Sequence, residues 1–400
     1  MEENILTPAM KQYFEIKENY SDCIIFFRMW DFYEMFLDDA NIAHKVLWIA
    51  ITSRNKNSKE PMALAWFPYH AKEKYLPLLA NAWYKIAIVE QVSDPKLKWI
   101  VKREVVRVVT PATLALEWEN YTTKSNVNNV ILSIYEENWI YSISFIDIWT
   151  NKWKTSIFEN FDKLKQELYK ISPLEVILDK KLFDNKAVND ILLKKYSLNI
   201  YYFEATENAR NKLINHFWVK NLEWFWIENK ILAQKSSSLL LEYLEKNQKS
   251  NLSFLNNLSF ETFSDFMDLD ETTLKSLDIL YNVATKSNSV GTLFWVLNKT
   301  KTSWWTRFLR EQLLKPLKDI EKIKERQDFI EDFYNNKILL EKVRENLKHI
   351  SDIDLILNRL ALNRANPRDL LNLKNSLKSI LEIFELIEKS WSERLKKIVK

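Results

Sequence analysis

The feature that most restricts this chain is its shortage of glycine. Its 400 residues contain 1 glycine and 16 tryptophans, whereas an average usage of about 7% predicts roughly 28 glycines. Turns and helix ends with positive φ normally take glycine, because a Cβ atom is strained there. A mixed α/β chain of this length needs such positions, so another residue type must occupy them.

Several tryptophans lie in surroundings that are typical of glycine. Trp118 and Trp153 stand between charged residues, Trp83 stands between an apolar helical run and an apolar strand, and Trp304-Trp305 precedes a helical run. We therefore hypothesise that UGA codons meaning glycine have been translated as tryptophan. The alternative is a protein that is genuinely rich in tryptophan.

Composition places the chain among globular proteins with two or three domains, because single cores usually split beyond about 250–300 residues. Hydrophobic residues make up 47% of it. It has no apolar run of the length that spans a membrane, and its first residues lack the blocks of a signal peptide. The single cysteine, Cys23, excludes an internal disulfide and fits a reducing cytoplasm. A net charge of +4 permits nucleic-acid binding without arguing for it.

Hydrophobic periodicity indicates three domains, at residues 1–113, 114–250 and 251–400. The first two alternate helical and strand patterns, and the third is helical to the end. The expected helices are residues 8–20, 36–46 and 236–246, and the expected strands are residues 23–28, 86–89, 105–109, 141–146, 154–158 and 176–178. We therefore predict an α+β multidomain protein with a mixed α/β first domain, an α/β second domain and an incomplete, all-helical third domain.

Four segments of the first domain resemble segments of the MutS family of DNA mismatch repair proteins. Residues 26–36 (FFRMWDFYEMF) resemble the family's RMGDFYE segment. Residues 61–71, 82–91 and 101–111 resemble PMAGxPYHA, GYKVAICEQ and VKREVVRIVTPGT. Three of the four carry tryptophan where the family has glycine, at Trp30, Trp66 and Trp83, which supports the codon hypothesis independently of composition.

The resemblance continues in family order along the rest of the chain. Residues 222–227 resemble LEGFGI, residues 266–270 resemble the entry to the family's core domain, residues 302–310 resemble TxGGRLLR, and residues 360–370 resemble ALGRANPRDL. Each short segment is modest support, but eight in order cover essentially the whole chain. The resemblance implies a mismatch-recognition domain, a ribonuclease-H-like connector and part of a helical lever.

The resemblance also implies a DNA contact through Phe32 and Glu34. In the family this Phe enters the minor groove and stacks on the mispaired base, and the Glu hydrogen-bonds to that base. An apolar wedge kinks a base step at a cost of a few kcal/mol, and a mispaired step yields more easily. The alternative is a purely structural role, with Phe32 in the core and Glu34 on a solvated helix.

Affinity for the DNA backbone should come from lysine and arginine. The stretch that includes Lys96, Lys98, Lys102, Arg103 and Arg107 is basic, and a solvated loop and strand face explains it equally well. From this stretch we expect Lys102, Arg103 and Arg107 at the DNA surface. We add Met29, which precedes the Phe-x-Glu pair.

Family members carry a DNA clamp and a C-terminal ATPase, and neither is recognisable here. We therefore expect no ATPase site and no cofactor in this chain, with ATP and Mg²⁺ belonging to the full-length family. The resemblance implies double-stranded DNA with mismatches or small loops as ligand, a MutL-type partner docking on the connector, and a homodimer when full length. It also implies a bacterial cytoplasmic location near the nucleoid, with no membrane contact.

Three other kinds of site are disfavoured. With tryptophan read as glycine, residues 149–155 become GTNKGKT, which is one residue short of a phosphate loop and is followed by a strand. Asp147, Glu175 and Asp179 suggest a nuclease metal site on a ribonuclease-H-like fold, but a relic of the fold is favoured. The four histidines show no ligand spacing for zinc.

Two further functions stay open beside mismatch reading. A MutS relative that binds recombination junctions would usually lack Phe-x-Glu, so Phe32 and Glu34 argue against it. A structural or nuclease module would use the Asp147 group.

The codon hypothesis makes a direct prediction. We expect UGA rather than UGG at the codons for Trp30, Trp66 and Trp83, and sequencing of the gene tests this. UGG at all three positions would contradict the hypothesis.

Overall fold

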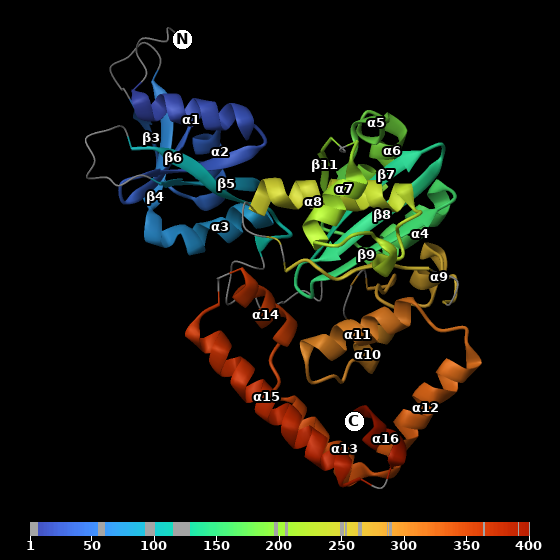
Figure 1. Ribbon diagram of the computed structural model, residues 1–400. Coiled ribbons are helices and arrows are strands. Elements are labelled where there is room, and N and C mark those ends of the chain that lie inside the picture. Colours follow the sequence, from blue (N-terminus) through green and yellow to red (C-terminus); the bar gives the residue numbers. More distant parts are fainter. Residues whose placement is uncertain are drawn as a thin grey trace.

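The protein consists of two mixed six-stranded sheets and a helical part (Figure 1). This computed structural model confirms the predicted α+β multidomain class. The structure describes residues 7–54, 61–92, 101–114, 129–195, 199–204, 207–248, 252, 254–262, 266–285, 287, 290–362, 365–390 and 392–399.

The first sheet has the order β3-β4-β2-β1-β5-β6, in which β1 and β5 are parallel and all other neighbours are antiparallel. Helix α1 packs on one face and α3 on the opposite face (Figure 1), and α2 packs on the same core as α3. The strands are β1 (Cys23–Met29), β2 (Phe32–Phe36), β3 (Ile51–Arg54), β4 (Met62–Pro68), β5 (Lys85–Gln91) and β6 (Arg103–Val109). The helices are α1 (Pro8–Asn19), α2 (Leu37–Leu47), the 3₁₀ turn η2 (Tyr69–Ala71) and α3 (Lys72–Asn81).

Alternation along β2 decides which side chains meet α1. Tyr33 and Met35 are buried in the core beneath α2 and α3. Phe32, Glu34 and Phe36 point to the opposite face, since side chains alternate along a strand. Phe36 is fully buried there, with its ring 4.8 Å from the ring of Tyr13 on α1. Phe32 and Glu34, further from the start of α2, are only half-buried.

The second sheet has the order β11-β10-β7-β8-β9-β12. Helix α8 packs on it through a seam of small residues, in which Ser236 and Ser142 lie 2.9 Å apart and Ser237 donates to Ser144 at 3.1 Å. The strands are β7 (Val130–Glu137), β8 (Ile140–Asp147), β9 (Lys152–Phe158), β10 (Glu175–Leu178), β11 (Asn199–Tyr202) and β12 (Leu258–Phe260). The helices are α4 (Phe161–Ile171), α5 (Lys180–Phe183), α6 (Lys186–Asp190), the π-helical η4 (Ile191–Lys195), α7 (Ala209–Phe217), the 3₁₀ turn η5 (Glu223–Phe225) and α8 (Ile231–Gln248).

The helical part begins beside the second sheet and extends away from it (Figure 1). Asn358 donates to the carbonyls of Ile148 and Trp149, so α14 is anchored on the β8–β9 hairpin. Helices α12 and α15 lead to a distal end formed with α13 and α16 (Figure 1). The helices are α9 (Glu271–Ser276), α10 (Leu293–Leu297), α11 (Ser303–Leu314), α12 (Ile320–Asn335), α13 (Lys337–Leu347), α14 (Ile353–Ala361), α15 (Pro367–Glu388) and α16 (Glu393–Val399). No helix of the described residues has the length and apolar character needed to cross a membrane.

Tryptophans occupy left-handed backbone positions. Among the described residues, 11 non-glycine residues have positive φ, and six of them are tryptophans. These six are Trp30, Trp48, Trp83, Trp139, Trp218 and Trp226, and each is at least half exposed. The codon hypothesis gains support, because a large side chain that is both strained and solvated contributes little at such a site.

Trp149 and Trp153, in the stretch 149–155 that becomes GTNKGKT when tryptophan is read as glycine, have different surroundings. Trp153 is fully buried, its Nε1 donates to Ser144 at 2.7 Å, and its ring lies 5.5 Å from that of Phe217. Trp149 is buried as well. Their surroundings in the structure therefore give no support for glycine, in contrast to the six left-handed positions. Trp118 lies outside the described residues.

A buried polar junction joins the first domain to the second. Lys85 of β5 forms an ion pair with Asp22 at 2.9 Å, and its ammonium lies 3.4 Å from the ring centroid of Tyr201 on β11. Glu175 of β10 is completely buried and accepts hydrogen bonds from the backbone of Ala112 at 2.9 Å and from Tyr243 at 3.1 Å. Burial raises the pKa of Glu175, although these hydrogen bonds and the charge of Lys85 act against the rise.

The left-handed tryptophans generate a stability prediction. Trp48 ends α2 with φ 56° and is 90% exposed, so Trp48→Gly should raise the free energy of unfolding by about 1 kcal/mol, by removing Cβ strain. Trp224 is 85% exposed but has no positive φ, so Trp224→Gly is the matched control and should bring no gain. Urea unfolding measures both, and an equal effect of the two substitutions would refute the strain argument.

Glu175 generates a pH prediction. A carboxyl group whose pKa is raised in the folded state stabilises the fold at low pH, and this contribution is lost as the pH rises from its ordinary value of 4.5 towards the raised value. Within that window the slope is about 1.4 kcal/mol per pH unit. Glu175→Gln should flatten this decline in urea unfolding measured from pH 4.5 upwards. Glu159→Gln, at an exposed glutamate, should leave the decline as it is in the unsubstituted protein.

Candidate nucleic-acid interface

The β1–β2 hairpin presents the Phe-x-Glu pair. Its two-residue turn consists of Trp30 and Asp31, and Met29 pairs with Phe32 across it. Trp30 has φ 53° and is 70% exposed, at the first position of a two-residue turn, where glycine is favoured. Asp31 accepts a hydrogen bond from the backbone of Tyr69 at 2.8 Å, which ties the turn to the end of β4.

Phe32 lies at the surface end of this hairpin. Its ring is half-buried and meets the ring of Trp66 edge to face, with centroids 4.8 Å apart. Trp66, on the neighbouring strand β4, is itself 46% exposed. Phe32 is therefore not sealed in the core. If position 66 is glycine, as the resemblance implies, the ring of Phe32 loses its cover and becomes more exposed.

Glu34 lies on the same face as Phe32, two residues further along β2. Its carboxylate is 3.4 Å from the guanidinium of Arg54, and the side chains of both residues are half-buried. Burial raises the pKa of Glu34, and the charges of Arg54 and Arg103 only partly oppose this. The neutral form of Glu34, which donates a hydrogen bond, is thus more accessible than for an ordinary glutamate. The structure places Glu34 on a strand, so the alternative of a solvated helix is wrong.

The predicted basic residues are in different environments. Arg103 is only 9% exposed, and its guanidinium donates to the carbonyls of Arg28 and Val101 at 2.8 and 3.0 Å. It is therefore buried and used within the fold, contrary to the expectation of an open DNA-contacting residue. Lys102 is exposed and pairs with Glu104 at 2.5 Å. Arg107 is half-buried on β6, opposite Ile88.

Met29 is partly buried against the core cluster under α1, next to the turn. Lys96 and Lys98 lie outside the described residues. Of the six predicted residues, Phe32, Glu34 and Met29 therefore lie together around the hairpin, whereas Lys102 and Arg107 lie on β6 or just before it. Their roles in DNA contact stay predictions.

Sequence reasoning missed two arginines at this site. Arg54 pairs with Glu34 only because β3 and β2 both flank β4, and no local pattern shows that contact. Arg28 places its guanidinium 3.8 Å from the ring centroid of Tyr69 and 4.0 Å from Glu90. Its place directly before Met29 in the resembling segment was the available signal.

The disfavoured metal group is dispersed. Glu175 accepts hydrogen bonds from Ala112 and Tyr243 at the domain junction. Asp179 caps α5 by accepting from the backbone of Leu182. Asp147 lies at the β8–β9 end near α11, where it accepts from the backbone of Trp149 at 2.9 Å. Within the described residues, no three His, Cys, Asp or Glu side chains are grouped to hold a metal ion.

The fold and this site define a multidomain α/β protein with an aromatic–carboxylate pair on the open part of its first sheet. Family models described as MutS domain I, MutS domain II and MutS domain III match residues 7–117, 129–257 and 272–399. The chain belongs to the MutS family.

Curated relatives agree along nearly the whole chain. The DNA mismatch repair protein MutS of Methanosarcina acetivorans is 39% identical over 98% of this chain and 45% of its own length. Those of Lachnoclostridium phytofermentans and Streptococcus agalactiae are 35% and 34% identical over 98% and 96% of this chain, and 42% and 43% of their own lengths. The chain thus spans less than half the length of these relatives.

Proposed function

We propose that this chain recognises mispaired or unpaired bases in double-stranded DNA as part of DNA mismatch repair. The observation that carries the proposal is that Phe32 and Glu34 share one open sheet face at the end of a hairpin, with neither side chain sealed in the core. The names of the relatives, DNA mismatch repair protein MutS, support the same process.

Phe32 would act as a wedge in the minor groove. Unstacking a base step costs a few kcal/mol, and the cost is smaller where a mispair has already weakened the stack. Discrimination then comes from the softness of the duplex rather than from a pattern of base edges. The position of the hairpin suits this role, because β2 is held between β1 and β4 in the sheet.

Glu34 would contact the base beside the wedge. A carboxylate near phosphates weakens binding to any duplex, so its presence favours a contact that homoduplex DNA does not offer. The raised pKa of Glu34 supports such a contact, because a neutral carboxyl group donates to a base acceptor.

The wider proposal follows the family. We propose that the longer protein is a homodimer that uses ATP and Mg²⁺, that it recruits a MutL-type partner through the second domain, and that it acts in the cytoplasm. A MutS-like protein that binds recombination junctions is the alternative, and the presence of both Phe32 and Glu34 disfavours it.

The wedge is tested by Phe32→Ala. Base–aromatic stacking contributes roughly 1–3 kcal/mol, so the variant should lose about tenfold or more of its preference for G·T and unpaired-T duplexes over homoduplex. Competition binding at fixed salt measures that preference. Phe183→Ala is the matched control, because Phe183 is a partly exposed aromatic residue on α5 of the second domain. Equal affinity for every duplex, unchanged by Phe32→Ala, would refute mismatch reading.

Glu34 is tested by Glu34→Gln, which keeps a hydrogen-bond donor and removes the negative charge. Homoduplex affinity should rise about fivefold, because a repulsion of about 1 kcal/mol with the phosphates is removed, while mismatch affinity should change less. The preference for mismatches therefore falls. Glu159→Gln controls for the loss of one exposed charge elsewhere. A fall in homoduplex affinity for Glu34→Gln would contradict the proposed role.

A further inference from the structure

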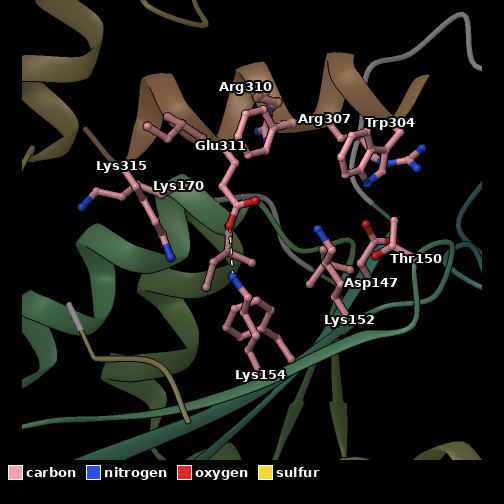
Figure 2. Close-up of a pocket in the computed structure, with 15 residues that line it drawn as sticks. Asp147, Thr150, Lys152, Lys154, Lys170, Trp304, Arg307, Arg310, Glu311 and Lys315 are labelled. Atoms are coloured by element: carbon pink, nitrogen blue, oxygen red, sulfur yellow. Dashed lines mark hydrogen bonds and ion pairs between the residues drawn. The ribbon is translucent and has the colours of Figure 1, made fainter. Parts of the chain in front are cut away.

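A cavity of about 110 Å³ lies between the β8–β9 hairpin of the second domain and α11 of the helical part. Side chains from the hairpin and from α11 face each other across it (Figure 2). It is far along the chain from the Phe32 site, and the mismatch-reading proposal makes no use of it. Its volume is several times what one water needs, so a tetrahedral anion fits.

The lining is strongly cationic. Six basic side chains line it, against the two carboxylates of Asp147 and Glu311. Those six are Lys152, Lys154, Lys170, Arg307, Arg310 and Lys315.

One half of the cavity is neutralised from within the protein. Lys154 pairs with Glu311 at 3.0 Å and with Glu261 at 3.2 Å, and Lys315 pairs with Glu261 at 3.0 Å. Lys170 pairs with Glu167 at 2.7 Å. These three glutamates neutralise the three lysines, so this end of the cavity has no excess positive charge.

The other half has donors without acceptors. Among the described residues, Arg310 and Lys152 have no hydrogen-bond or ion-pair partner. Arg307 directs its terminal nitrogens to Asp352, at 2.5 and 3.1 Å, and to Asp354, at 3.5 Å, but its Nε is buried with no hydrogen-bond partner. Burial also lowers the pKa of Arg310 to about 10, and the negative charge of Asp147 opposes this change only in part.

Asp147 adds selectivity to this half. Its carboxylate lines the cavity, and it accepts a hydrogen bond from the backbone of Trp149 at 2.9 Å. It would repel a fully deprotonated anion but would accept a hydrogen bond from an anion that carries an O–H group. At neutral pH, hydrogen phosphate has such a group and sulfate does not.

We propose that this cavity binds inorganic phosphate, with Arg310, Lys152 and Arg307 Nε donating to its oxygens and Asp147 accepting from its P–OH group. The bound ion would link the hairpin of the second domain to α11 of the helical part, because its donors come from both. The ring of Trp304 also lines the cavity, but none of its atoms is a donor or acceptor in the proposed recognition.

Thermal unfolding at pH 7.5 and constant ionic strength tests the proposal without DNA, and therefore independently of the mismatch-reading proposal. Saturating phosphate, exchanged for chloride, should raise the Tm by about 2–4 °C. Sulfate should give no rise. Arg310→Gln should abolish the phosphate effect, whereas Lys163→Gln, at an exposed lysine on α4, should retain it.

Asp147→Asn should remove the selectivity, so that sulfate stabilises this variant as well as phosphate does. Broadening of the ³¹P resonance of phosphate by the unsubstituted protein provides a readout that does not depend on the stability of any variant. No broadening, or equal Tm shifts in phosphate, sulfate and chloride, would overturn the proposal. A Tm rise with adenosine monophosphate but not with phosphate would overturn the assignment of the ligand as free phosphate.

Discussion

The position of the candidate DNA-reading hairpin depends on the buried junction around Glu175. A carboxylate with no exposure requires several donors, and it receives them from Ala112 at the exit of the first domain and from Tyr243 on α8. Lys85 adds a cation over the ring of Tyr201. Because both domains contribute and every member is paired, tilting one sheet against the other would leave a buried charge without a partner, which is strongly unfavourable. The first domain is thereby held in a fixed orientation on the second.

Much of this fold is predictable from local pattern. The helix expected from residue 8 is α1, which begins at Pro8, and the apolar runs at residues 23–28 and 86–89 become β1 and β5, because such features need only neighbouring residues. Non-local contacts were not predictable. Glu34 meets Arg54 through strand order, and Arg103 donates to the carbonyl of Arg28, which lies 75 residues away along the chain. The candidate site was found through its family segment, while its electrostatics came from the fold.

The scarcity of glycine and the exposed tryptophans both follow from the need for left-handed backbone positions. The backbone needs left-handed residues at the end of α2, at the β1–β2 turn and before β5, and tryptophan stands at all three, at Trp48, Trp30 and Trp83. Sequence surroundings identified such positions only in part, since Trp153 has similar polar neighbours along the chain yet fills the core of the second domain. Backbone geometry separates these two groups of tryptophan better than composition does.

The return of the chain to the second sheet after α8 has a practical consequence. Strand β12 pairs in parallel with β9, so the second sheet is completed by residues beyond the boundary expected at residue 250. A fragment that ended before β12 would leave the outer edge of β9, with its backbone amides and carbonyls, open to pairing with other molecules. Any attempt to isolate the second domain must therefore include Phe260, or the product will be prone to self-association.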